Sequence, residues 1–518
     1  MRLKRLVFAA ILVAAGAAAC ATAPSTGMSR VLGLFEQSVD VGDVAHAGHV
    51  SFDRPHGVYT ITGSGANMWG RADAFQFAAV RRTGNLHIAT DVDWVGAGVE
   101  PHRKAGPMVR QNLTPGSPYV DVMVHGSGLT SLQYRDVQDG PSNEIVIANN
   151  GTAPKRVRLE VEDGFAYVSI AGADGSLVHG GGNYKVPFEG EYYAGLAVSS
   201  HNNTVSETAR FSNVEISAPT LAPIADTGPT ARVESTLEVI DVGNGNRRVV
   251  HRFPGKIEAP NWARDGSLIY NADGLLYSIP NTGGEPRVIN TGPRNNLNND
   301  HGISPDGTQL VVSDRSPTDG VSRIYVLPIT GSDNPREVVS HPTGRSYWHG
   351  WTPDGRTLAY TASRPEFNND YDVWTKDLAG RRERNLTPSP GLDDGPEYTP
   401  DGRWLYFNSV RSGQMQIWRA KPDGSNPEQV TFDPQYRDWF PHFSPDGRWM
   451  VFLSFYSNDV VLGQHPSNRS VVLRIAPTDG SAPPRVLTRL FGGQGTINVP
   501  SWSPDSRSIA FVSYRLAR

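Results

Sequence analysis

The sequence contains a single cysteine, Cys20, among its 518 residues, so no intramolecular disulfide can form. Its main apolar run, residues 6–15, is too short to cross a bilayer as a helix. The formal net charge is only -4 and the basic residues are scattered, which excludes a nucleic-acid-binding face. The hydrophobic content of 38% is sufficient for two to four domains with their own cores.

The first twenty residues have the layout of an export signal. Three basic residues (Arg2, Lys4 and Arg5) precede the apolar run, and small residues then lead to Cys20. A lone cysteine in this place resembles the lipobox of bacterial lipoproteins, although Ala17 stands where leucine is usual. The resemblance implies that residues 1–20 are a signal peptide, that Cys20 carries a lipid anchor, that residues 21–29 are a tether, and that the protein faces the periplasm from the cell envelope. Secretion, with Cys20 discarded together with the signal, is the alternative.

Residues 30–217 show no helical periodicity. Short alternating segments such as LHIATDVDWV (86–95) and YVDVMVH (119–125) are separated by Gly, Asn and Asp turns, a pattern that predicts an antiparallel β-sandwich. The stretches WGRADAFQF, KAGPMVRQ and LTSLQYRD resemble those of bacterial concanavalin-like jelly-roll domains. Such domains often accompany carbohydrate-active domains and serve equally as spacers. Residues 218–232 are rich in proline and lack periodicity, which indicates an interdomain linker.

Residues 233–518 are repetitive. A turn of the Pro-Asp-Gly type recurs six times, each time followed by strand-like segments, so that each repeat predicts a four-stranded propeller blade. The turn aspartates are Asp265, Asp306, Asp354, Asp401, Asp446 and Asp505. The last repeat lacks its outer strands, and the segments TLEVIDV and RRVVHRF at the start of the domain are suited to replace them and close the ring. The whole chain is therefore predicted to be all-β: a jelly-roll sandwich followed by a six-bladed β-propeller.

The Pro-Asp-Gly repeats resemble those of the TolB family of β-propellers, over residues 233–518. The resemblance implies the propeller fold and, by analogy with TolB in the Tol-Pal system, a protein partner in the envelope. The N-terminal α/β domain through which TolB acts is not recognisable, because the predicted β-sandwich occupies its place.

Residues that begin the innermost strands are the candidates for a site in the central channel. Where four repeats carry proline, two carry histidine, His301 and His349, each followed by glycine, Gly302 and Gly350. Glycine would give the imidazole room to turn toward the axis. Imidazoles with oxygen donors suit Zn or Mn, and the predicted metal set is His301, His349, His442 and Gln494. A hydrogen-bonded structural role is the alternative for each histidine.

Neighbouring polar and aromatic residues extend this candidate site. Glu397 and His442 are the candidate catalytic residues, Glu397 as base or ligand. Aromatic faces stack on sugar rings. The predicted ligand-binding residues are Tyr347, Trp348, Asp394, Trp439 and Asn498. The sequence contains no nucleophile elbow, no phosphate-binding loop, no dinucleotide fingerprint and no His-Glu-x-x-His motif. These absences argue against serine-hydrolase chemistry and leave binding or metal-assisted chemistry.

Two functional hypotheses follow. The first is an exported lipoprotein that binds or processes an oligosaccharide or polysaccharide, by lyase or hydrolytic chemistry at a divalent metal, because the chain resembles oligogalacturonate lyases in its TolB-like repeats and its candidate metal ligands. The second is a non-catalytic envelope protein that binds a peptide or protein partner through the propeller, with the sandwich as a spacer.

Overall fold

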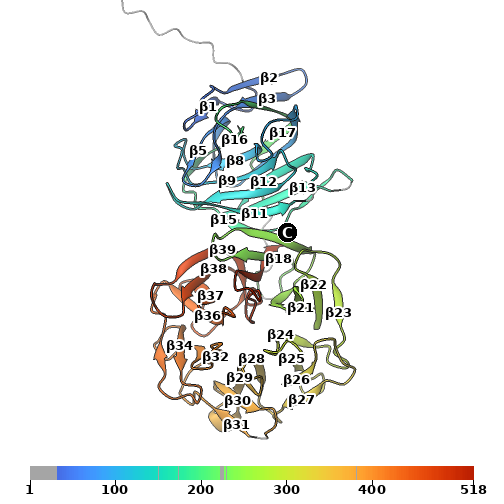
Figure 1. Ribbon diagram of the computed structural model, residues 1–518, viewed down its shortest axis with the longest axis vertical. Coiled ribbons are helices and arrows are strands. Elements are labelled where there is room, and N and C mark those ends of the chain that lie inside the picture. The colour runs from blue at the N-terminus through green and yellow to red at the C-terminus, as the bar shows by residue number, and fades with distance from the viewer. Residues whose placement is uncertain (1–31, 150, 173, 222–226, 229, 381) are drawn as a thin grey trace, which may run out of the picture.

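A computed structural model describes residues 32–149, 151–172, 174–221, 227–228, 230–380 and 382–518. The described residues form strands β1 to β40 and one 3-10 turn, η1 (Pro365–Phe367). The N-terminal sandwich and the ring of the propeller lie one above the other along the long axis of the molecule (Figure 1). The predicted signal peptide, Cys20 and the tether lie outside the described residues. Within the described part of the chain, no helix is long and apolar enough to cross a membrane.

The N-terminal part consists of two antiparallel sheets. The first sheet has the strand order β1 (Gln37–Val41), β6 (Phe75–Thr83), β16 (Glu191–Ser199), β8 (Lys104–Arg110), β9 (Tyr119–His125), β10 (Thr130–Arg135) and β11 (Ser142–Ala148). The second has the order β14 (Leu177–His179), β13 (Phe165–Ala171), β12 (Arg156–Glu162), β7 (Leu86–Val95), β17 (Glu207–Ser217), β3 (Val58–Gly63) and β2 (His49–Asp53). In addition, β15 (Tyr184–Lys185) pairs with β13, and β4 (Met68–Trp69) pairs with β5 (Ala72–Asp73).

Alternating apolar residues hold these two sheets together. Val120, Val122 and Val124 of β9 lie in one buried core with Val157 and Leu159 of β12. This is the packing expected of a β-sandwich, in which every second residue of a strand faces the other sheet. The predicted sandwich is therefore present, while its relation to concanavalin-like domains stays a prediction.

The C-terminal part contains five separate four-stranded antiparallel sheets, arranged as blades around a ring (Figure 1). Blade 1 comprises β20 (Glu258–Trp262), β21 (Ser267–Ala272), β22 (Leu275–Pro280) and β23 (Arg287–Ile289). Blade 2 comprises β24 (Leu297–Ile303), β25 (Gln309–Arg315), β26 (Ser322–Pro328) and β27 (Arg336–Val339). Blade 3 comprises β28 (Ser346–Trp351), β29 (Thr357–Ser363), β30 (Tyr371–Asp377) and β31 (Glu383–Asn385). Blade 4 comprises β32 (Asp393–Tyr398), β33 (Leu405–Ser409), β34 (Gln416–Ala420) and β35 (Glu428–Gln429). Blade 5 comprises β36 (Tyr436–Phe443), β37 (Trp449–Tyr456), β38 (Ser467–Pro477) and β39 (Arg485–Gly493).

The ring is closed by strands from the two ends of the domain, as predicted. β18 (Val233–Asp241) pairs with β40 (Ser508–Leu516) along its whole length, and β19 (Arg247–Phe253) pairs with β18. These three strands do not form a separate sixth sheet, however. β19 also pairs in parallel with β11, so that one ten-stranded sheet runs from the sandwich into the ring. Six separate blades are thus not shown: five stand alone.

The repeated turns owe their shape to their aspartates. In each of the six turns the carboxylate accepts a hydrogen bond from the backbone N–H two residues further on, at 2.9–3.1 Å. In the last repeat Ser506 takes the place of glycine and keeps the positive φ of 62°. The six aspartates therefore have the structural role that the repeat predicts for them.

Buried polar contacts reinforce the junction between sandwich and propeller. The side chain of Asn183 donates to the carbonyl of Tyr514 at 2.8 Å and accepts from the N–H of Phe491 at 2.9 Å. Arg515 of β40 donates to Glu160 of β12 at 2.6 Å. Burial would raise the pKa of Glu160, but the charge of Arg515 and the hydrogen bond from Ser169 outweigh it and lower the pKa to about 2. The two parts are thus joined by a shared sheet and by ion pairs across it.

Replacing this arginine tests the junction. Arg515→Ala is expected to lower the free energy of unfolding by roughly 1–3 kcal/mol at pH 7, because it leaves a buried carboxylate with fewer partners. The folded-state pKa of Glu160 lies below its ordinary value of 4.5, so the stabilisation is present above pH 4.5 and is lost as the pH falls toward 2. Urea denaturation at pH 7 and pH 3 measures this difference. Arg403→Ala, which removes an exposed ion pair with Asp401, is the control and should change stability by less than about 1 kcal/mol. Equal effects of the two variants would contradict the assigned role.

Candidate functional site

Each innermost strand of the five blades contains a β-bulge. In blade 3, Trp348 pairs with Tyr360 and Gly350 with Ala359, so His349 is the extra residue. The other bulges lie between residues 258 and 261, 297 and 301, 394 and 397, and 439 and 442. A bulge leaves its extra residue unpaired and redirects its side chain. The bulges therefore decide which side chains face the centre of the ring.

Some of the bulges hold the backbone in the left-handed region. Gly395 has a φ of 63°, which glycine adopts without strain, but Phe440 has a φ of 55°, which is unusual for a bulky side chain. The side chain of Asn408 accepts a hydrogen bond from the N–H of Phe440 at 3.1 Å and so helps to hold this conformation. Backbone strain of this kind gathers at functional sites.

A cavity of about 580 Å³ opens beside these bulges. Its walls come from the innermost strands β24, β28, β32 and β36, which Figure 1 shows nearest the centre of the ring, and from neighbouring loops. The lining includes two carboxylates, two imidazoles, several amides and two tyrosines: Asn296, Asn298, Asn299, Asp300, Arg315, Tyr347, His349, Thr361, Tyr371, Leu392, Asp394, Phe440, His465 and Gln494. A volume between 300 and 1,000 Å³ is typical of ligand sites. It is therefore the candidate site of the molecule.

His349 and Asp394 form an ion pair in this cavity. Nε2 of His349 lies 3.1 Å from Oδ1 of Asp394, which also accepts a hydrogen bond from Thr361 at 2.6 Å. Burial would lower the pKa of His349, but the carboxylates of Asp394 and Asp300 outweigh it and raise this pKa. Burial would likewise raise the pKa of Asp394, and the charge and hydrogen bond of His349 instead lower it to about 2. Both shifts favour the charged forms of the pair, an imidazolium beside a carboxylate.

Asp300 is buried without an ion-pair partner at contact distance. It is 7% exposed, and burial raises its pKa to about 6 against the opposing charge of the more distant His349. Asn498 donates to its Oδ1 at 3.2 Å, and Asn298 donates to its Oδ2. Among the described residues no ion pair joins this carboxylate to a lysine or arginine. Two amides therefore support a buried carboxylate whose charge is offset only in part, by an imidazole that is already paired with Asp394.

The structure separates the four predicted metal ligands. His349 and Gln494 line the cavity, whereas His301 and His442 do not. His301 follows the bulge of blade 2, pairs regularly with Val312, and is fully buried, and this burial lowers its pKa to about 4. His442 is bonded on both ring nitrogens, to Glu397 at 2.6 Å and to the carbonyl of Ile497 at 3.0 Å. His301 and His349 therefore occupy equivalent positions in the sequence repeats, but only His349 lies at the cavity.

The glycines after these histidines also have a different role from the predicted one. A Cβ on Gly302 would lie 1.9 Å from the ring of Trp348 in the next blade. A Cβ on Gly350 would lie 2.6 Å from the carbonyl oxygen of Pro396, again in the next blade. Both glycines allow neighbouring blades to approach closely, and they do not free the imidazole.

Of the remaining predicted site residues, some line the cavity and others are buried in the hydrophobic cores between blades. Tyr347 and Asp394 line the cavity, and Asn498 supports Asp300 from behind. Trp348 and Trp439 are buried in the cores between blades, where no sugar ring can reach their faces. Glu397 is occupied by His442 and by the N–H of Phe443 at 2.9 Å, so the proposed catalytic pair is a hydrogen-bonded link between blades. Tyr371, Phe440 and His465 also line the cavity, and no repeat pattern in the sequence marks the strand start, the bulge and the loop that carry them.

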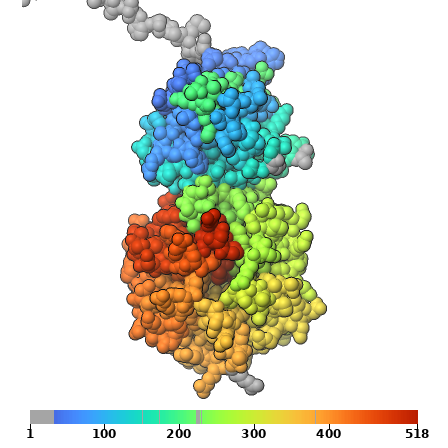
Figure 2. All heavy atoms as spheres, viewed as in Figure 1, coloured from blue at the N-terminus to red at the C-terminus, as the bar shows by residue number. Residues whose placement is uncertain are grey.

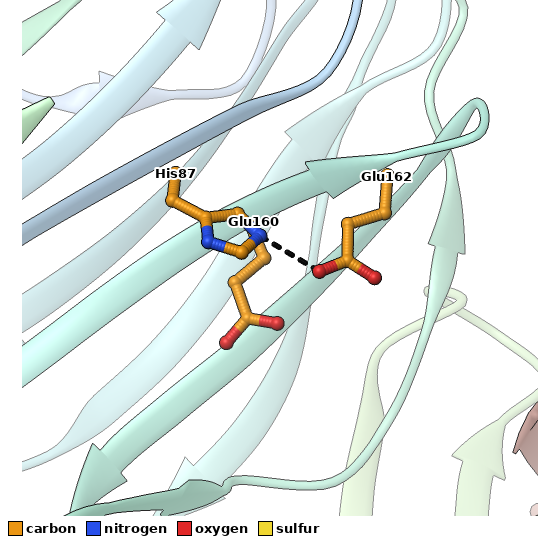
Figure 3. Close-up of side chains that lie close together, drawn as sticks. All are labelled: His87, Glu160 and Glu162. Atoms are coloured by element: carbon orange, nitrogen blue, oxygen red, sulfur yellow. Dashed lines mark hydrogen bonds and ion pairs between the residues drawn. The ribbon is translucent and has the colours of Figure 1, made fainter. Parts of the chain in front are cut away.

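Within the described residues, one group of three side chains has the ligand spacing of a metal site, and it lies in the sandwich. His87, Glu160 and Glu162 converge as Figure 3 shows, with His87 Nε2 2.7 Å from Glu162. Glu160, however, already accepts from Arg515 at 2.6 Å and from Arg158 at 2.8 Å. Since two guanidinium groups neutralise these oxygens, the group is an ion-pair network of the junction.

The incompletely compensated charge of Asp300 has a consequence for stability. Burial raises the pKa of this group from 3.8 to about 6. The folded state therefore favours the neutral carboxyl, and this contribution to the free energy of unfolding is lost as the pH rises through 6. The shift corresponds to a cost of about 3 kcal/mol for burying the charged form. Asp300→Asn is therefore expected to stabilise the protein by roughly 1–3 kcal/mol at pH 8 and by much less at pH 4. Urea denaturation at the two pH values measures this. A variant that is no more stable than the wild type at pH 8 would refute the assignment.

The opposite result is expected for the pair between blades 4 and 5. His442→Ala removes a partner of the buried carboxylate of Glu397 and should cost roughly 2–4 kcal/mol of unfolding free energy. His56→Ala, which removes an exposed histidine beside Asp53, serves as the control and should cost less than about 0.5 kcal/mol. Thermal and urea unfolding compare the two, and a near-neutral His442→Ala would show that this link is dispensable.

Comparisons with known proteins agree with this architecture. The family described as "TolB beta propeller domain" matches residues 318–472. The uncharacterized protein Atu1656 of Agrobacterium fabrum is 43% identical over 297 residues, which cover 57% of this chain and 97% of that protein. A protein described as "TolB homolog", from Chlorobium luteolum, is 33% identical over 116 residues, which span 22% of this chain and only 24% of that protein.

A solved structure extends the comparison to three dimensions. The structure of putative TolB from Agrobacterium tumefaciens is 44% identical in sequence, with a TM-score of 0.51, and the match covers 55% of this chain and 99% of that one. The matched share of this chain is about the size of the propeller part. With its Pro-Asp-Gly turns and its ring of four-stranded sheets, the chain belongs to the family of TolB-type β-propeller proteins.

Proposed function

We propose that this protein is a non-catalytic, TolB-type binding protein of the cell envelope, whose propeller holds a segment of a protein partner in the axial cavity. The observation that carries this proposal is the cavity itself, lined by side chains from four blades. A second cavity of about 340 Å³ adjoins it and shares Leu297, Asn298, Asn299 and Gln494. Together they provide more room than a single side chain needs and suit an extended segment.

The kinship with TolB homologues supports a place in the envelope and a partner there. The predicted export signal and the predicted lipid anchor at Cys20 agree with the same location. We further infer that β40, β18 and β19, with Trp502 bridging Ile509, act as the sixth blade of the ring, and that a concanavalin-like sandwich serves as the spacer.

Metal-assisted carbohydrate chemistry stays a prediction with less support. Two of its four ligands, His301 and His442, lie outside the cavity, and its candidate catalytic pair, Glu397 and His442, is engaged between blades. A metal-bound form of the cavity would have to use a different set of ligands, centred on His349.

A binding measurement tests the proposal directly. The probe is Pal, the protein that is named beside TolB in the Tol-Pal system, taken from Agrobacterium fabrum, the organism of the 43% identical relative. The purified full-length protein in detergent micelles is titrated with the soluble domain of Pal, and the dissociation constant is expected to be on the order of micromolar, as for transient complexes. Tyr371→Ala and Leu392→Ala, on the cavity wall, should weaken binding at least about tenfold, or about 1.4 kcal/mol. Glu285→Gln, an exposed charge change in the loop between β22 and β23, should leave binding unchanged.

Two outcomes would count against the proposal. Failure of the wild-type protein to bind Pal, or binding that the cavity variants do not affect, would remove its basis. Cleavage of oligogalacturonate in the presence of Mn, abolished by His349→Ala, would support the carbohydrate hypothesis instead.

A further inference from the structure

The electrostatics of the cavity indicate what kind of group enters it. Asp300 and Asp394 are both buried carboxylates of its wall, and His349 pairs with Asp394 alone at 3.1 Å. Even when His349 is protonated, one imidazolium shared by two carboxylates leaves a net negative charge on the three groups. Arg315 also lines the cavity, but it is exposed to solvent, which screens its charge far more than that of a buried group.

The hydrogen bonds around Asp300 leave acceptors without donors. Asn498 is 1% exposed, and while its Nδ2 donates to Asp300, its Oδ1 has no partner among the described residues. This oxygen lies behind Asp300 and is not part of the cavity lining. A ligand group that only donates hydrogen bonds, such as an ammonium or a guanidinium, would add charged donors to a carboxylate that now has only neutral amide donors.

The spacing and size of the site favour an organic cation over a bare metal ion. Within the described part of the chain, the imidazole and carboxylate ligand atoms of the cavity do not form a group of three within 4.8 Å of one another, in contrast to His87, Glu160 and Glu162. Tyr347 and Tyr371 form one wall, with ring centroids 6.3 Å apart, and Asp300 lies close enough to Tyr347 to influence it electrostatically. Aromatic rings beside a carboxylate are the surroundings that ammonium and guanidinium groups prefer.

We propose that the segment held in the cavity presents a lysine, an arginine or an N-terminal amine, whose cationic group binds the carboxylate of Asp300 beside the rings of Tyr347 and Tyr371. This inference rests on the proposed function, and it names the chemistry of the partner. The cation compensates the net negative charge of the site and donates hydrogen bonds to the carboxylate of Asp300. Asp394 remains bound to His349 and positions it.

Small peptide mimics test this inference without the partner. N-acetyl-arginine amide, N-acetyl-lysine amide and the neutral isostere N-acetyl-citrulline amide are titrated into the full-length protein, and binding is followed by ligand-observed NMR. Dissociation constants on the order of 1 mM are expected for the two cations, given the ligand efficiency of groups this size. The citrulline compound should bind at least tenfold more weakly.

Matched variants locate the binding group. Asp300→Asn should weaken the arginine compound at least tenfold, and thermal unfolding verifies that this variant is folded. Glu285→Gln removes one exposed negative charge outside the cavity and should bind as the wild type does. Equal binding of arginine and citrulline compounds, or unchanged binding by Asp300→Asn, overturns the inference.

Two further measurements distinguish a cation site from a metal site, and the cation inference from the proposed protein partner. Chlorides of Mn, Zn and Ca are titrated alone, and tight binding that depends on Asp300 while the arginine compound stays unbound would show a metal site and overturn the cation inference. Binding of the arginine compound without binding of Pal would support the cation inference and refute Pal as the partner. Pal binding that depends on Tyr371 but not on Asp300 would support the proposed function and refute the cation inference.

Discussion

The pairing of β18 with β40 is the contact on which the rest of the architecture depends. It joins residues 233–241 to residues 508–516 and so closes the ring. Because β19 continues this sheet into β11, the same closure also attaches the sandwich to the propeller. In the space-filling view of Figure 2 the two parts are in direct contact along the line of this shared sheet. A ring fixed in this way keeps the inner strands of different blades at constant separation, which a site built from several blades requires.

Within the closed ring, the bulges determine the chemistry of the axis. A regular inner strand would send alternate side chains to opposite faces, and the same position of each repeat would then face the centre. The bulges differ in length and place from blade to blade, so the residues that reach one cavity come from three positions of the repeat: Asp300 and Phe440 from one, and His349 and Asp394 from two others. An asymmetric site thus arises from a nearly symmetric fold. The strained φ of Phe440 belongs to this local departure from regularity.

The same feature explains how far the sequence could predict the molecule. The repeated turns are local, since each aspartate binds a backbone N–H two residues away, and so they are visible in the sequence and led to the propeller and to its closure. The bulges depend on pairing with the next strand, and no local pattern marks them. His301 and His349 therefore appeared equivalent, although only His349 lies in a bulge. Trp348 appeared to be a ligand-binding residue, but it fills the space that Gly302 leaves between blades. The loop residue His465 lies outside the repeat and could not be placed at all.

Two buried carboxylates of the inner strands, Glu397 and Asp300, have different hydrogen-bond partners. The difference separates a structural role from a functional one. Glu397 accepts from His442 and from a backbone N–H, so its burial is compensated within the fold and contributes to stability. Asp300 receives only neutral amide donors, and burial raises its pKa, which means that its charged form weakens the folded state. A buried charge of this kind lowers the stability of the folded state. An asparagine at this position would fill the same space without that loss of stability. A group that destabilises the free protein and faces a cavity is accounted for when a ligand compensates it, and for a carboxylate that ligand is a cation.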